Sequence, residues 1–345
     1  MNNNNNKEKT IMNKMTKLGV SALCGSLAAV ASANAGDLSV SGGVDMSWQS
    51  FDDTQTGNPI GIGSNYTLSG SGELDNGWGV ALSIAATNQM AYSNTNVVVT
   101  VPTIGDLRIS HGVSGSGIDR IDDVTPNVWE EAYGTGLSTG INTVAGVSGS
   151  TNIEWTPNML PDGITARVSW SPDVSGSKSN DKSSSGGATS AGSGYDITLA
   201  LGEGVTGMSG LTIGGGISNK EQPQDGRSDI EEMTVYATYA IGGLTLGYQW
   251  SEEDLGVTSG AKQYDNSGYG VTFAINDDLS VGYNHYESEQ SNTTNVTAEA
   301  TSVQIAYSMG GASIRLAESS SDNEDYQTGV NFDRDATTLS VSLAF

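Results

Sequence analysis

The candidate functional residues of this sequence are charged, and they would act through electrostatic attraction and repulsion. Five acids fall within a long stretch, residues 113–149, in which Arg120 is the only base. They are Asp119, Asp122, Asp123, Glu130 and Glu131. If this stretch faces a water-filled passage, its acids attract cations and constrict the passage electrostatically. The alternative is that the stretch lies outside the fold and that its acids are simply solvated.

Three arginines occupy positions that would oppose such a stretch. Each stands between two apolar residues where apolar and polar residues alternate: Arg108, Arg167 and Arg315. Because successive side chains of a strand point to opposite faces, each arginine lies opposite its apolar neighbours. An arginine that faces lipid is costly, so we expect all three on the inner wall. Acids on the stretch and arginines on the wall would then set a field across the passage.

Few residues are suited to nucleophilic or acid–base catalysis. The chain has two histidines and one cysteine. His111 and His285 each fall in register with the apolar residues of an alternating segment, near its end. Cys24 lies in the N-terminal apolar run. No serine has the G-x-S-x-G context of a nucleophile elbow. We therefore expect no enzyme activity, no catalytic residue and no fixed metal site or cofactor, and at most loosely bound Ca²⁺ at acidic loops.

The end of the chain indicates the element that must position these charges. Residues 336–345 read ATTLSVSLAF, in which Leu339, Val341, Leu343 and Phe345 alternate with polar or small residues. Residues 37–49 alternate in the same way. An unpaired terminal strand invites aggregation, and closing the sheet into a barrel removes that edge. The sequence therefore predicts that these two segments pair and close a barrel.

Alternating segments recur along the whole chain, and we count about 16 of them, with 14 or 18 left open as alternatives. Tight turns such as Asp75-Asn76-Gly77 and Gly242-Gly243 mostly follow the even segments, and long polar connections mostly follow the odd ones. This asymmetry is typical of outer-membrane barrels, which have short periplasmic turns and longer external loops. We predict an all-β, transmembrane antiparallel β-barrel, with the long stretch after strand five folded inward. A barrel of this size leaves an aqueous channel.

The N-terminus predicts export. Two lysines precede an apolar run, residues 18–31, and an Ala-x-Ala site follows it, which is the pattern of a cleaved secretory signal peptide. The expected leader spans residues 1–35, with its start at Met12 or Met15, and the expected barrel domain spans residues 36–345. Removing the leader's four Lys and one Glu from 14 basic and 39 acidic residues leaves a net charge of −28. This balance excludes a nucleic-acid binder, which needs a basic footprint.

Several of these features together resemble the general porins of Gram-negative outer membranes. They are the acidic mature chain, the DNGWGVAL stretch, the insertion after the fifth segment and the C-terminal LSVSLAF. The resemblance covers essentially the whole mature chain. It implies homotrimers, passive diffusion of ions and small hydrophilic solutes, and a third loop that constricts the lumen. It also implies contact with outer-membrane lipid and lipopolysaccharide, and recognition of Phe345 by the barrel-assembly machinery. The acidic balance adds an expected preference for cations.

Two other functions stay open from the sequence. A substrate-specific channel would need a row of aromatic residues or arginines along the lumen. Inward positions are mostly Ser, Thr, Gly and Ala, with Tyr236 and Tyr286 as exceptions, which favours a general pore. The other alternative is a non-conducting adhesin or structural barrel.

Overall fold

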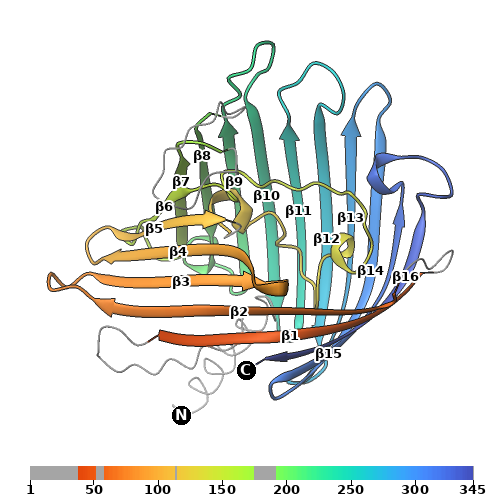
Figure 1. Cartoon of the computed structure of the whole chain (residues 1–345), viewed down its shortest axis with the longest axis horizontal. Coiled ribbons are helices and arrows are strands. Elements are labelled where there is room, and N and C mark those ends of the chain that lie inside the picture. Colours follow the sequence, from red (N-terminus) through yellow and green to blue (C-terminus); the bar gives the residue numbers. More distant parts are fainter. Residues whose placement is uncertain (1–37, 52–57, 113–114, 175–191, 345) are drawn as a thin grey trace.

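The protein is a closed antiparallel barrel, described by a computed structural model over residues 38–51, 58–112, 115–174 and 192–344 (Figure 1). Each strand pairs with its neighbours in sequence. The 16 strands are β1 (Leu38–Phe51), β2 (Ile60–Glu73), β3 (Gly79–Thr87), β4 (Ala91–Val101), β5 (Gly105–Gly112), β6 (Asn152–Thr156), β7 (Ile164–Ser171), β8 (Gly194–Leu201), β9 (Leu211–Lys220), β10 (Ile230–Ile241), β11 (Leu244–Asp254), β12 (Gln263–Ala274), β13 (Leu279–Ser291), β14 (Val296–Met309), β15 (Ala312–Asp322) and β16 (Arg334–Ala344). Within the described residues, helical structure is confined to short turns: η1 (Asn88–Met90), η2 (Gly117–Arg120), η3 (Ala132–Gly134), α2 (Glu203–Thr206) and η4 (Glu324–Tyr326).

The first and last strands close the barrel. β1 pairs with β16 in a register that places Met46 opposite Val341 and Phe51 opposite Ala336. This confirms the predicted fold class and the count of 16 strands. The predicted leader over residues 1–35 and the terminal Phe345 lie outside the described residues.

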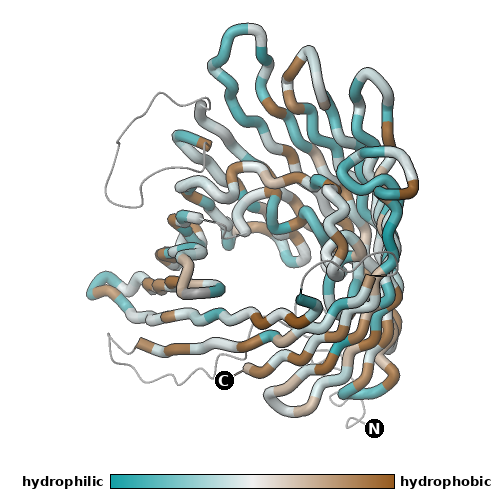
Figure 2. Tube along the Cα trace, turned by 45° about the vertical axis from the view of Figure 1, so that its right-hand side comes forward, coloured by the Kyte–Doolittle hydropathy of each residue, from teal (hydrophilic) through white to brown (hydrophobic). Residues whose placement is uncertain are grey.

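The two faces of the wall have the polarity that the alternation predicts. On β14, Val303 and Ile305 point outward and are 57% and 39% exposed, whereas Ser302 and Gln304 point inward and are 0% and 1% exposed. Figure 2 shows apolar residues along the wall and hydrophilic residues at the upper strand ends, where the longer connections lie. No helix in the described part of the chain has the length and apolar composition needed to cross a membrane.

Several strands are longer than the hydropathy pattern indicates. β2 already begins at Ile60, inside a stretch that reads as polar loop, and β11 includes Glu252 to Asp254, which also read as loop. β13 and β14 extend until only residues 292–295 separate them. On β11, β13 and β14, backbone pairing continues beyond the apolar band, where the outward face is no longer apolar, so hydropathy no longer marks the strand.

Candidate pore constriction

Residues 115–149, between β5 and β6, run along the inside of the barrel, and we call them the inner segment (Figure 1). Their backbone is held by inward side chains of the wall. The Val124 N–H donates to Gln249 Oε1 at 2.9 Å, and the Trp129 N–H donates to Gln304 Oε1 at 3.0 Å. The segment therefore narrows the lumen along the side formed by the later strands.

Asp196 of β8 binds both ends of the inner segment. It is 0% exposed, and its carboxylate accepts the N–H groups of Ile118 and Val147, each at 3.1 Å. Gly117 and Gly146 have positive φ angles of 61° and 55°. A Cβ atom on either glycine would collide with the Asp196 carboxylate. Glycine at both positions therefore lets the backbone approach this buried acid closely.

Two further buried acids of the wall join the segment to charged side chains. Glu154 of β6 accepts a backbone N–H of the segment at 2.7 Å and lies 2.6 Å from Arg120 Nη2. Glu232 of β10 accepts the Gly146 N–H at 2.7 Å and lies 2.8 Å from Lys220 Nζ. A buried carboxylate needs such partners to offset its lost hydration. The single base of the segment, Arg120, is thus neutralised by the wall.

Two small apolar clusters complete the attachment. One joins Ile118, Ile121 and Val144 to Tyr236, and the other joins Ala132 to Tyr286 and Ala300. Tyr133 packs edge-on against Tyr286, with ring centroids 4.8 Å apart. The two inward tyrosines noted in the sequence therefore lie against the inner segment and do not form an aromatic row along an open path.

Four of the predicted acids of the segment have raised pKa values, and they differ in protonation. Burial, with repulsion from Asp123, raises the pKa of Asp122 to about 9, and burial raises the pKa of Asp123 to about 6. Burial, with the hydrogen bond that the protonated Glu131 donates to Glu130, raises the pKa of Glu131 to about 10. Burial also raises the pKa of Asp119. Near neutral pH, Asp122 and Glu131 therefore hold a proton. Asp123 is mainly ionised, because its side chain is accessible to water although the surrounding protein partly desolvates it.

The three predicted arginines lie on the inward face, close to wall acids. Arg108 Nη1 donates to a carbonyl of the inner segment at 2.8 Å and lies 3.9 Å from Glu154. Arg167 lies within electrostatic range of the same glutamate. Arg315 is 2% exposed, and its Nη1 lies 3.5 Å from Asp45 Oδ2. Positive charge on the wall is thus partly balanced by the wall itself.

Sequence reasoning missed the wall residues that hold the inner segment. They are Glu154, Asp196, Glu232, Gln249 and Gln304. Most of them stand between two apolar or aromatic neighbours, as the predicted arginines do. An inward acid or amide in the middle of a strand was therefore a usable signal for an attachment point.

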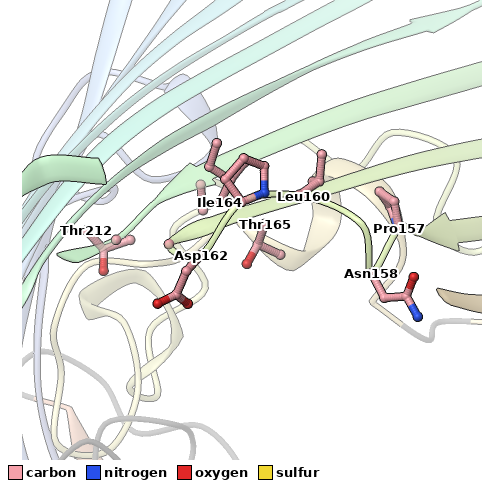
Figure 3. Close-up of a pocket in the computed structure, with 11 residues that line it drawn as sticks. Pro157, Asn158, Leu160, Asp162, Ile164, Thr165 and Thr212 are labelled. Atoms are coloured by element: carbon pink, nitrogen blue, oxygen red, sulfur yellow. The ribbon is translucent and has the colours of Figure 1, made fainter. Parts of the chain in front are cut away.

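A pocket at the tight-turn end of the barrel is separate from this site. It is formed by the connection between β6 and β7, the start of β7, the end of β8 and the start of β9. Figure 3 shows Asp162 between Thr212 on one side and Asn158 on the other. Asp162 is the one titratable side chain among the residues that line the pocket, so the lining offers no acid–base pair.

Comparison with known proteins decides the family. The family model described as Gram-negative porin matches residues 19–312. The chain belongs to the Gram-negative porin family. No curated protein matches its sequence.

Solved porin structures share the fold of this porin at low sequence identity. The anion-selective porin from Comamonas acidovorans is 13% identical, with 90% of this chain and 99% of that chain covered and a TM-score of 0.66. OmpT of Vibrio cholerae is 12% identical, with 91% and 99% covered and a TM-score of 0.64. OmpF of Salmonella typhi, in complex with daunomycin, is 10% identical, with 89% and 97% covered and a TM-score of 0.63. Family and fold together make this protein an outer-membrane β-barrel porin, whose apolar outer face meets lipid.

This orientation predicts a large difference between adjacent residues of β11. Leu246 points outward and is 42% exposed, so Leu246→Arg places a charge in lipid and is expected to lower the free energy of unfolding by about 2–4 kcal/mol. Thr245→Arg, at the same depth on the inward face, is expected to change it far less. Denaturant unfolding of the barrel refolded in lipid vesicles measures both variants. Equal losses would contradict the assigned orientation of this strand.

Proposed function

We propose that this porin forms a water-filled channel for passive diffusion of ions and small hydrophilic solutes, with a preference for cations. The observation that carries the proposal is that Asp123 is exposed on the inner segment, with the half-buried Glu130 on the same segment. The nearby bases Arg108 and Arg120 lie beside the buried Glu154. A permeating ion therefore meets negative charge on the inner segment, which attracts cations and slows anions.

The charge of the whole molecule supports the same preference. The chain carries a net charge of −25, which raises the local concentration of cations at the channel mouths. Arg315 of β15 lies within electrostatic range of Glu130 on the inner segment. We propose that this pair, together with Asp123, sets a transverse field at the narrow point.

Cation preference is expected to fall as the pH drops through about 6. The raised pKa of Asp123 means that its carboxylate is ionised above that pH and gains a proton below it. Reversal potentials in a KCl gradient at pH about 7.5 and about 5 measure the change. The Asp123→Asn variant is the control, because it should lose most of the pH dependence in this interval. A wild-type preference that is the same at both pH values would contradict the role of Asp123.

General diffusion is favoured over substrate specificity because the inward residues of β2 to β4 are mostly Ser, Thr, Asn, Gly and Ala. Such a wall offers hydrogen bonds but no stacking surface. Swelling of liposomes that contain the protein, in uncharged sugars of increasing size, tests this. A smooth fall of the rate with size supports the general pore. One sugar that enters out of size order would indicate a substrate-specific channel, and no swelling would indicate a non-conducting adhesin or structural barrel.

We propose that the porin assembles as a homotrimer, in contact with outer-membrane lipid and lipopolysaccharide. The family supports the trimer, and native mass measurement tests it, with a monomeric mass as the contrary result.

We also propose that the barrel-assembly machinery recognises the terminal strand through Phe345. Deleting Phe345 is expected to lower the yield of assembled barrel, and an unchanged yield would argue against recognition.

Sequencing the mature N-terminus tests the predicted leader over residues 1–35, since cleavage there leaves Gly36 first.

Loosely bound Ca²⁺ at acidic loops is a further proposal, motivated by acids near the strand ends such as Asp254, Asp322 and Asp325. Carboxylate oxygens are the ligands that Ca²⁺ prefers. Equilibrium dialysis with ⁴⁵Ca²⁺ is expected to show weak binding that salt abolishes. Tight, salt-resistant binding would contradict the loose mode.

A further inference from the structure

The outer face of β13 and β14 carries three metal-ligating side chains at one height. His285 and Glu287 are two residues apart on β13 and so share a face. Glu299 of β14 stands directly opposite Glu287 in the antiparallel register. One ligand atom from each of these three residues lies within 4.8 Å of the other two. The site lies outside the barrel and takes no part in the proposed channel.

The imidazole of His285 is already oriented toward the carboxylates. Its Nδ1 lies 2.9 Å from Thr301 Oγ1, and its Nε2 lies 3.1 Å from Glu287 Oε1. The ring of Tyr269 packs against it, with centroids 5.1 Å apart. A hydrogen bond to one ring nitrogen fixes the ring so that the other nitrogen is presented to a metal. Thr301 occupies that supporting position.

The surroundings favour a cation and leave it accessible. The side chain of Glu287 is 50% exposed and that of His285 is 14% exposed. Asp322 of β15 lies directly opposite Glu299 and adds further negative charge. Tyr269 and Tyr283, whose rings lie 6.1 Å apart, mark the aromatic level just below the site. The cluster therefore lies above the apolar band, where water can reach an ion and occupy its remaining positions.

We propose that His285, Glu287 and Glu299 form a binding site for a borderline divalent metal ion of the Zn²⁺ type. One imidazole nitrogen and two carboxylate oxygens suit Zn²⁺ or Co²⁺ better than the harder Ca²⁺ or Mg²⁺, which take oxygen ligands. The ion binds Nε2 of the neutral imidazole and replaces the contact between Nε2 and Glu287. Any proton on Nε2 is released to solvent. The three ligands leave the outward side of the ion open.

The test is metal binding by the whole refolded barrel in detergent, with excess Ca²⁺ present to occupy the acidic loops. Co²⁺ is the spectroscopic probe, because its visible bands report a nitrogen-containing ligand set, and Zn²⁺ competition gives the affinity. We expect one tight site per chain. His285→Gln and Glu299→Gln are each expected to weaken Zn²⁺ binding by at least about tenfold, and Thr301→Val by about tenfold.

His111→Gln is the matched control. This second histidine also bonds a threonine through Nδ1, to Thr151 Oγ1 at 2.6 Å, and packs on a tyrosine ring, Tyr92, at 5.8 Å. It has no place in the three-ligand cluster, so its replacement should leave the affinity unchanged. Circular dichroism and channel conductance confirm that each variant is folded. The proposal is overturned if Zn²⁺ does not compete with Co²⁺ at one site, or if folded His285→Gln and Glu299→Gln bind as the wild type does.

Discussion

Replacing Asp123 and Glu130 together, as Asp123→Asn and Glu130→Gln, removes most of the channel's preference for cations over anions. Asp123 is exposed and Glu130 is half-buried on the inner segment. A unit charge about 4 Å from an ion contributes about 1 kcal/mol even in bulk water, and more where the dielectric is lower. Each lost charge is therefore expected to lower the ratio of K⁺ to Cl⁻ permeability by a factor of about 5 or more. Reversal potentials in a KCl gradient give the ratio.

The matched control is the protonated pair, replaced as Asp122→Asn and Glu131→Gln. Burial raises the pKa of both groups to well above 7, so each already holds a proton at neutral pH. An amide resembles a protonated carboxyl in size and keeps a hydrogen-bond donor toward the neighbouring acid. We expect this double variant to retain most of the wild-type selectivity. If this control loses as much selectivity as the double variant of Asp123 and Glu130, the assigned protonation of Asp122 and Glu131 is wrong.

Replacing Asp196 by alanine loosens the inner segment and raises the single-channel conductance. The change leaves the N–H groups of Ile118 and Val147 without their carboxylate acceptor. Each unpaired buried N–H costs roughly 1–3 kcal/mol, so both ends of the segment lose stability relative to a detached state. We expect larger, noisier openings and faster hydrogen exchange at these two amides. Conductance in planar bilayers and exchange detected by mass spectrometry measure the two effects.

Asp106→Ala is the control for this variant. Asp106 is also an inward acid of the barrel, but its carboxylate accepts a hydrogen bond from Thr100 at 2.7 Å, within the wall. Its removal should leave conductance and segment exchange close to the wild type. Unchanged conductance and exchange in a folded Asp196→Ala barrel would show that this acid does not position the segment.

The closure of the barrel could be predicted from sequence because both terminal segments alternate strictly. The alternation of Leu339, Val341 and Leu343 has a counterpart in Val44, Met46 and Trp48, and the structure pairs the two strands. The start of β2 was harder to see. Ile60 and Ile62 alternate with glycines, which have no side chain to mark the inner face, so the stretch reads as a loop. Near Glu287 and Glu299 the outward positions are no longer apolar, and backbone pairing defines the strands.

The candidate site, like the fold, could be predicted only in part from the sequence. The acids of residues 113–149 could be identified from the sequence, because the residue type alone shows that a side chain can be charged. Their protonation could not, because it depends on how deeply each carboxyl is buried. Asp122 and Asp123 are neighbours in the chain, yet burial raises the pKa of one to about 9 and of the other to about 6. The alternation of apolar and polar residues also does not show that a wall acid such as Glu154 neutralises Arg120, because that contact joins residues far apart in the chain.

Whether this porin is a cation-preferring aqueous channel can be measured as the reversal potential of the wild-type barrel in a planar bilayer under a KCl gradient at neutral pH. We expect stepwise ohmic openings and a reversal potential of the sign that K⁺ permeation gives. A reversal potential near zero or of the sign for Cl⁻ would contradict the cation preference, and a folded barrel without openings would contradict the channel itself.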